Sequence, residues 1–163
     1  MAWWRRDWND IPRPHRQKPK TPWTIAKHIV REAVVRLRRD ASRPSTTTNS
    51  HWIYSEHRQP IPATPHVGKW LIFQSPDDVD NAWTSIEAAM KIRILGFDAK
   101  VSTAFDVRDG FHVICVYTRD WRDEADVMRV RRGLEKIGFT DTLYYKRDED
   151  TRAGRSCHTY KYP

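Results

Sequence analysis

Cysteine is scarce in this 163-residue chain, which contains only Cys115 and Cys157. The two do not form a C-x-x-C pair, so the sequence provides neither a disulfide framework nor a zinc site. No Ser-His-Asp set, P-loop, G-x-G-x-x-G motif or metal-ligand spacing is present either. We therefore expect no cofactor and no metal.

Long apolar runs are also missing. No run of apolar residues approaches the length that crosses a membrane, and the N-terminus, Met1 to Arg6, lacks the apolar core of a signal peptide. We expect no membrane span and a reducing, cytoplasmic setting.

Negative charge is scarce in one part of the chain only. Residues 1–66 contain 13 Lys and Arg against 5 Asp and Glu, whereas residues 67–163 contain 16 of each. The whole excess of eight positive charges therefore lies in the N-terminal part. This asymmetry favours a polyanionic partner, such as RNA or another nucleic acid, for that part of the chain.

The N-terminal part divides into three segments by composition. Residues 1–22 form a basic tail rich in Trp and Pro, residues 23–39 a basic amphipathic helix, and residues 40–66 a Ser/Thr/Pro-rich linker or wrapping loop. Within the last of these, residues 52–54 are apolar and aromatic and could add a strand or anchor the loop. Rings interleaved with cations can stack on bases while the cations meet phosphates. The candidate nucleic-acid-binding residues are Trp3, Trp4, Arg5, Arg6, Lys27, Arg31, Arg38 and Arg39.

Both the tail and the helix have a second interpretation. The tryptophans could instead dock on the chain's own domain or on a protein partner. The helix could pack its apolar residues on the domain and leave its charges in solvent, or it could lie on RNA, a membrane surface or a partner. The residues on its apolar stripe are Ile25, Ile29, Val30, Ala33, Val34 and Leu37.

Residues 67–163 have the pattern of a globular domain. A strand at 69–74 is followed by a helix with Ser75 as N-cap and Gly96 as its stop. A hairpin pairs 99–105 with 111–118 around Asp109-Gly110. A second helix starts at 120–123 and ends at Gly138. A strand at 142–146, a mobile loop at 148–155 and a strand at 158–162 complete the order. This predicts an α+β domain with helices on one face of a mostly antiparallel, twisted sheet.

Several motifs of this domain resemble the basophilic leukaemia-expressed protein family. They are Gly68 to Phe73, Ala99 to Thr103, His112 to Thr118, Gly138-Phe139 and Leu143 to Lys146. The resemblance covers roughly residues 66–163. It implies a fold similar to the translation-initiation cap-binding protein, in which a curved sheet is backed by helices and a nucleotide is held between tryptophans.

Bacterial members of that family are called phosphothreonine lyase domain proteins, by likeness to secreted effectors that eliminate phosphate from phosphothreonine. By this likeness Lys100 matches the catalytic base and Lys69 the phosphate-binding lysine. The position of the catalytic acid is occupied by Leu71, so the acid is missing. His112 could substitute only if the hairpin brings it near Lys100. It would pair close to Ala104, which lies four residues, or about 13 Å, along the strand from Lys100, and this distance argues against a direct role.

The alternative to an enzyme is a binding module, which is the function we expect first. Lys69, Lys100 and Arg119 would hold a phosphorylated ligand or nucleic acid, and Trp121 or Trp70 would stack on a base. A phosphothreonine lyase-like enzyme is the second expectation, and a protein-interaction scaffold acting through the N-terminal segment is the third. The first two require Lys69 and Lys100, on neighbouring strands, to converge on one side of the sheet.

Overall fold

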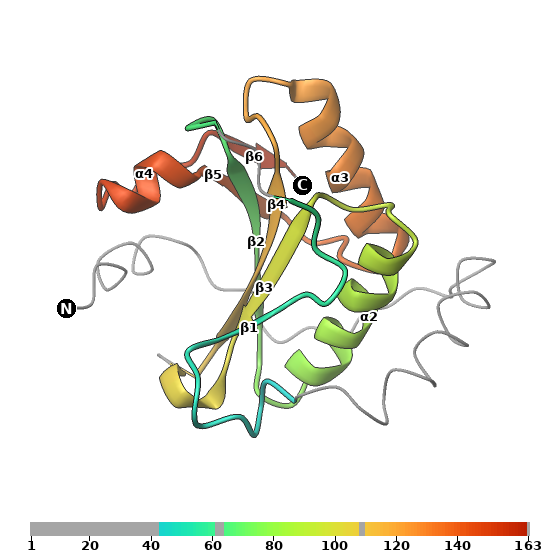
Figure 1. Ribbon diagram of the computed structural model, residues 1–163, viewed down its shortest axis with the longest axis vertical. Coiled ribbons are helices and arrows are strands. Elements are labelled where there is room, and N and C mark those ends of the chain that lie inside the picture. Colours follow the sequence, from blue (N-terminus) through green and yellow to red (C-terminus); the bar gives the residue numbers. More distant parts are fainter. Residues whose placement is uncertain (1–42, 61–63, 108–109, 163) are drawn as a thin grey trace.

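The computed structural model describes residues 43–60, 64–107 and 110–162. These residues form one six-stranded antiparallel sheet with the order β1-β3-β4-β2-β5-β6. Figure 1 shows the sheet between two layers, with α2 and α3 on one side and the short α4 on the other. The α+β fold with a mostly antiparallel sheet is confirmed.

The elements follow the predicted order, with one strand added before them and one short helix near the C-terminus. The strands are β1 (Trp52–Tyr54), β2 (Gly68–Gln74), β3 (Asp98–Ser102), β4 (His112–Thr118), β5 (Leu143–Arg147) and β6 (Tyr160–Tyr162). The helices are α2 (Val79–Lys91), α3 (Glu124–Lys136) and α4 (Asp148–Arg152), with a 3-10 turn, η1 (Ala104–Asp106), after β3.

The predicted hairpin exists, and its register is fixed by the alternation of its side chains. Strand β3 pairs with β4 so that Lys100 lies opposite Cys115 and Val101 opposite Ile114. The first arm is shorter than predicted, because the chain leaves the strand after Ser102 and turns into η1. There the side chain of Thr103 accepts a hydrogen bond from the amide of Phe105, which is typical of a cap rather than a strand.

The two faces of the sheet differ, because α2 and α3 cover one face and only the short α4 lies on the other. Alternate residues of the central strands, such as Trp70, Val101 and Val116, face α2 and α3 and form the main core. The other set, which includes Leu71 and Cys115, faces away and forms a second, smaller cluster. Along each strand, one residue therefore faces the main core and the next faces the opposite side of the sheet.

Helix α2 begins later and ends earlier than the sequence suggests. Its first residue is Val79 and its N-cap is Asp78, whereas Ser75 belongs to the turn before it and donates its hydroxyl to the Asp78 carboxylate at 2.6 Å. The helix ends at Lys91, and Arg93 takes the left-handed conformation with φ 59°. Gly96 is thus not the helix stop, and it is required instead by its close packing against the backbone of Tyr117.

Helix α3 agrees with its predicted signals. The N-cap Asp123 accepts a hydrogen bond from the amide of Asp126 at 3.0 Å, and Gly138 follows the helix with φ 105°. Substituting Asp123→Ala is expected to cost about 1 kcal/mol of stability, because the amide loses its partner at the helix end. Urea unfolding checks this, and an unchanged midpoint would mean that water replaces the cap without cost.

One segment differs from its prediction, and for another the structure takes one of the two alternatives left open. Residues 148–155, expected to be a mobile loop, begin with α4, whose Asp148 and Arg152 are paired at 2.8 Å. The carboxylate of Asp150 is buried and bonded to Arg147 at 2.6 Å, which fixes the helix on the sheet. Residues 52–54 add a strand, so the folded unit includes part of the segment expected as a linker or wrapping loop.

The predicted tail at 1–22 and helix at 23–39 lie outside the described residues. Within the described ranges, none of the helices has the length and apolar character needed to cross a membrane.

Candidate functional site

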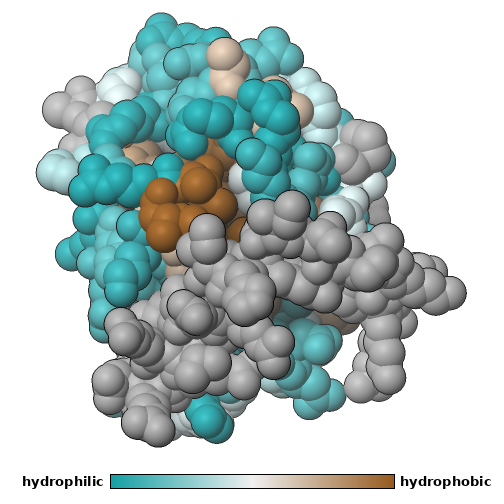
Figure 2. Space-filling view, turned by 90° about the vertical axis from the view of Figure 1, so that its right-hand side faces the viewer, coloured by the Kyte–Doolittle hydropathy of each residue, from teal (hydrophilic) through white to brown (hydrophobic). Residues whose placement is uncertain are grey.

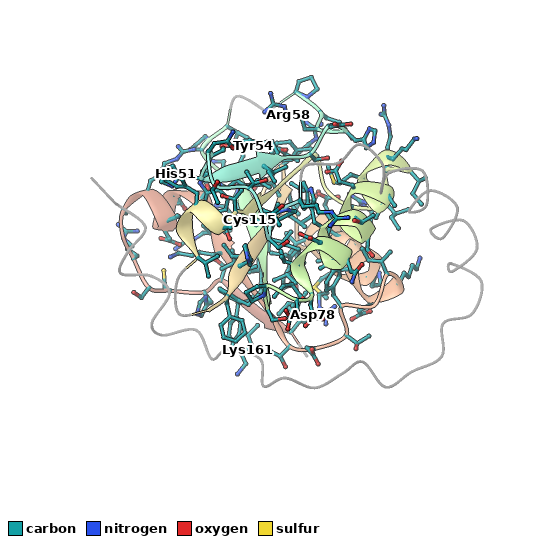
Figure 3. All side chains as sticks on the ribbon, turned by 90° about the horizontal axis from the view of Figure 1, so that it is seen from below. His51, Tyr54, Arg58, Asp78, Cys115 and Lys161 are labelled. Carbon is teal, nitrogen blue, oxygen red and sulfur yellow. The ribbon has the colours of Figure 1, made fainter. Side chains whose placement is uncertain are left out.

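The sheet face that α2 and α3 leave uncovered contains an unusual concentration of lysines and aromatic rings. Figure 3 shows Cys115 near its centre, Tyr54 on β1 towards one edge and Lys161 towards the other. We call this surface the lysine face. It comprises Trp52, Tyr54, Lys69, Leu71, Phe73, Asp98, Lys100, Val113, Cys115, Tyr117, Tyr144 and Lys146.

Lys69 and Lys100 lie on this same face, as both functional expectations require. They do not come from neighbouring strands, however, because β4 lies between β2 and β3. Their long side chains meet over β4 instead. The ammonium of Lys69 lies 5.5 Å from the ring centroid of Tyr117, and that of Lys100 lies 5.9 Å from the same centroid.

Lys69 is a buried cation with a carboxylate partner. Its Nζ donates to Oδ1 of Asp148 at 2.7 Å, and the lysine is 5% exposed. Burial alone would raise the pKa of Asp148, but the charges of Lys69 and Arg152 and their hydrogen bonds outweigh it and lower that pKa. The first residue of α4 therefore holds the ammonium of Lys69 in place.

Lys100 has a different environment. Its ammonium lies 4.0 Å from the ring centroid of Trp52 and 6.0 Å from that of Tyr54, which is cation–π distance. No carboxylate within the described ranges forms an ion pair with it. Burial lowers the pKa of Lys100 from its ordinary 10.5, and the charge of Lys69 lowers it further.

Tyr117 and Cys115 form the floor between the two lysines. Burial raises the pKa of the Tyr117 phenol well above its ordinary 10. Burial likewise raises the pKa of the Cys115 thiol, while the two lysines oppose that rise. Both groups therefore stay neutral near pH 7, and the positive charge of the two ammonium groups is not cancelled by the floor beneath them.

Two residues expected at the site lie on the opposite side of the sheet. Trp70 is fully buried in the main core, where its indole nitrogen donates to the carbonyl of Val127 at 3.1 Å. His112 is also fully buried, and its Nδ1 contacts the carbonyl of Ser102 at 2.8 Å. Trp70 is therefore not available to stack on a ligand, and His112 cannot protonate a ligand beside Lys100.

Arg119 and Trp121 follow β4 and lie beside the sheet rather than on the lysine face. Arg119 bonds Gln59 at 2.9 Å, and its guanidinium lies 5.2 Å from the ring centroid of Phe97. Trp121 is partly buried against the main core, with the guanidinium of Arg147 at 4.8 Å from its ring centroid. The structure therefore does not bring either residue together with Lys69 and Lys100.

The structure adds residues that the sequence interpretation did not place at the site. Trp52, Tyr54 and Tyr117 surround the ammonium of Lys100, and Asp148 holds Lys69. Strand alternation finds Tyr117 only once the hairpin register is known, since Tyr117 shares parity with Cys115, which lies opposite Lys100. Trp52 could not, because nothing in the sequence says which strand β1 joins.

The remaining candidates lie outside the described residues. These are the proposed nucleic-acid-binding residues of the N-terminal segment, Trp3, Trp4, Arg5, Arg6, Lys27, Arg31, Arg38 and Arg39. Among the residues that the structure does describe, no three His, Cys, Asp or Glu side chains are grouped so that they could hold a metal ion.

The Lys69–Asp148 pair leads to a pH-dependent prediction. Because the pKa of Asp148 is lowered in the folded state, its carboxylate stabilises the fold above the ordinary value of 3.8, and this stabilisation is lost as the pH falls through the lowered pKa. We expect Asp148→Asn to cost about 2 kcal/mol at pH 7, since it leaves a buried ammonium unpaired. The cost should shrink below about pH 4.

Urea unfolding at several pH values measures this effect. Glu149→Gln is the matched control, because Glu149 is the next residue, is 40% exposed and pairs with Arg147 at 3.5 Å. It should cost less than about 0.5 kcal/mol. Equal losses for both variants at pH 7 would contradict the importance of the buried pair.

The comparisons with known proteins are consistent with this architecture. The family model described as basophilic leukemia-expressed protein Bles03 matches residues 63–152. A schistosome eIF4E complexed with m7GpppG and 4E-BP is 20% identical, over 80% of each chain, with a TM-score of 0.59. C. elegans eIF4E-3, complexed with the 4E-binding protein Mextli and a cap analog, is 16% identical over 80% of each chain, with a TM-score of 0.58. The likeness to these two structures shows a shared fold.

Proposed function

The chain belongs to the basophilic leukemia-expressed protein Bles03 family, and from this premise we propose that it is a binding module for a phosphorylated ligand. The ligand lies on the lysine face, with its phosphate near Lys69 and Lys100. A nucleotide is the class that fits best, because aromatic rings stand beside the cations and can stack on a base.

One observation carries the proposal. Lys100 is a half-buried cation with a lowered pKa and no carboxylate partner within the described ranges, and it lies near a second buried lysine. Such an arrangement costs stability, because burial penalises the charge and Lys69 repels it. A bound phosphate would neutralise Lys100 and could accept a further hydrogen bond from Lys69, whose ammonium already pairs with Asp148.

The rings around Lys100 support a nucleotide over a bare phosphate. The ammonium of Lys100 now lies over Trp52, and a phosphate that draws this ammonium towards Lys69 would leave the ring free for a base. Stacking on such a ring contributes about 1–3 kcal/mol per base. The two solved structures of the same fold are complexes with a cap dinucleotide and a cap analog.

The test is calorimetric titration of the full chain with guanosine triphosphate and with inorganic triphosphate, at low and high salt. We expect both to bind, the nucleotide at least about fivefold more tightly, with affinity falling as salt rises. Trp52→Leu should remove the preference for the nucleotide and leave triphosphate binding intact. Absence of binding, or binding indifferent to salt, would contradict the proposal.

The N-terminal segment adds nonspecific affinity for RNA or DNA in this proposal, because the excess positive charge lies there. Replacing Arg5, Arg6, Lys27 and Arg31 with glutamine should weaken binding of single-stranded RNA uniformly across sequences and reduce its salt dependence. An unchanged salt dependence would assign RNA binding, if any, to the folded domain alone.

Elimination of phosphate from phosphothreonine is the second candidate, favoured by the lowered pKa of Lys100, which a base requires. The matching acid position is filled by the buried, apolar Leu71, and His112 lies on the other face. Incubation with a phosphothreonine peptide, followed by mass spectrometry for loss of phosphoric acid, distinguishes an enzyme from a binding module. A third candidate, a scaffold for a protein partner, predicts a complex that is indifferent to nucleotides.

A further inference from the structure

Helix α2 is buried on more than the side that faces the sheet. Val79, Ile86 and Met90 face the core and are at most 2% exposed. Ala88 follows Ile86 by two residues, so it lies about 200° around the helix, on the outward side. It is nevertheless only 1% exposed. An alanine that points away from the core of a surface helix is normally open to solvent, so another part of the chain must cover it.

The described segments beside α2 bond to a different part of its surface. The amide and hydroxyl of Ser45 donate to the Asp80 carboxylate at 3.0 and 2.7 Å, and Ser55 bonds Glu87. Asp80 and Glu87 lie about 80–100° from the core line, on one flank of the helix. Neither contact reaches the outward side on which Ala88 lies.

The outward side of α2 is followed by further apolar residues beyond the C-terminal end of the helix. Ile92 follows Ala88 by one helical turn and is 45% exposed, and Ile94 is partly buried beyond it. Figure 2 shows a hydrophobic area on the helix-bearing side of the molecule, with hydrophilic residues above it and beside it. A small residue followed by a larger apolar one is a surface that a second helix can approach closely.

From this we propose that the outward side of α2, around Ala88 and Ile92, is a docking surface for the chain's own segment 23–39. Three observations favour this occupant. The segment has an apolar stripe of six residues at helical spacing, Ile25, Ile29, Val30, Ala33, Val34 and Leu37. It ends four residues before Arg43, where the described chain begins, and Ser45 is already bonded to the first turn of α2.

Length and charge fit as well. Helix α2 has 13 residues, about 20 Å, and the six residues that follow Arg39, up to Ser45, can extend about 20 Å, so the segment can reach the whole helix. The segment's basic end, Arg36 to Arg39, enters beside the acidic start of α2, Asp77 to Asp80. Opposite charges at that junction favour an intramolecular fit.

Docking of the segment on α2 determines which way its basic side chains point. With the apolar stripe against α2, residues such as Lys27 and Arg31 face solvent on the side of the molecule opposite the lysine face. The inference is independent of the proposed ligand, because it concerns a surface on the other side of the sheet.

Hydrogen exchange of the full chain, read by mass spectrometry, tests the inference. We expect the amides of residues 25–37 to be protected at least about tenfold over an unstructured chain, at all protein concentrations. Ala88→Arg should remove this protection, while Ala125→Arg, the same substitution at an exposed position of α3, should leave it unchanged. The amides of β4 report whether each variant is still folded.

A second variant changes the docking segment instead of the surface of α2. Val34→Asp together with Leu37→Asp should release the segment and make the amides of α2 exchange faster, without changes in the central strands. Protection of residues 25–37 that disappears on dilution would overturn the inference and indicate docking between two copies. Exchange of residues 25–37 at unstructured rates in the unmodified chain, or protection that survives Ala88→Arg in a folded variant, would also overturn it.

Discussion

Replacing Lys100 with methionine is expected to weaken the binding of guanosine triphosphate by about ten- to a hundredfold while leaving the fold at least as stable as before. A hydrogen bond between a charged group and a ligand contributes about 1.5–3 kcal/mol, and every 1.4 kcal/mol corresponds to a factor of ten. Methionine has a similar length and no charge, so it removes the phosphate contact without leaving a cavity.

The stability part of this expectation follows from the direction of the pKa shift. Because burial lowers the pKa of Lys100, the folded protein disfavours its charged form, and this penalty is present at neutral pH. The contact with Trp52 offsets some of it. The penalty fades as the pH rises through the lowered pKa towards 10.5, so the stability gap between wild type and Lys100→Met should narrow at high pH.

Lys91→Met is the matched control for this experiment. It removes the same charge from an exposed position in the last turn of α2, on the helix side of the sheet. Its effect on nucleotide affinity should be less than about twofold, because water and salt screen a distant surface charge. If both variants bind alike, the lysine face is not the site. If Lys100→Met is strongly destabilised, Lys100 has a structural partner instead.

The second large effect is expected at Gly96. A Cβ built there would lie 1.7 Å from the carbonyl oxygen of Tyr117, an atom that already accepts the amide of Phe97 at 3.1 Å. The obstacle is backbone in the central strand β4, which cannot move aside as a side chain can. Gly96→Ala is therefore expected to destabilise the fold by more than about 4 kcal/mol, at the upper end for a single substitution.

Gly154→Ala provides the comparison for chemical unfolding. Gly154 has φ 66°, but nothing lies within 4 Å of its added Cβ, so its cost is confined to the left-handed conformation, about 1 kcal/mol. A similar loss in both variants would show that β4 can shift at Tyr117. That result would also imply that the ring between the two lysines is less firmly held than the packing suggests.

Gly96 illustrates what the sequence could and could not provide. A glycine after an amphipathic helix is typical of a helix stop, but the left-handed position is taken by Arg93, and Gly96 is required by a strand distant in sequence. Close approach between remote segments leaves no local signal. The capping of α3 by Asp123 and its end at Gly138, by contrast, are entirely local and were predictable.

Some features of the candidate site could likewise be predicted from the sequence, and others could not. Alternation alone places Lys69 and Trp70 on opposite faces, so the choice of Trp70 as a stacking ring could have been excluded once Lys69 was assigned to the site. His112 could not be excluded by alternation alone, because its face depends on the hairpin register, and the structure pairs Lys100 with Cys115. Strand order was the missing information, because it brings Trp52 and Tyr54 next to Lys100 and inserts β4 between the lysines.

Helix α4 was missed for a third reason. Its five residues are all polar, so the hydrophobic periodicity that indicates helices is absent. The charge spacing was present, with Asp148 and Arg152 four residues apart, but such pairs contribute little on their own. What orders this helix is the burial of Asp150 and the contact of Asp148 with Lys69, and both depend on the tertiary fold.

The two edge strands have a consequence for any shortened form of this protein. Strands β1 and β6 have three residues each and close the sheet on either side, yet both lie beyond residues 63–152. A fragment trimmed to 63–152 would lose both and leave the longer β3 and β5 with unpaired backbone groups. Bare strands of that kind recruit other chains, so such a fragment should self-associate and precipitate where the full chain does not.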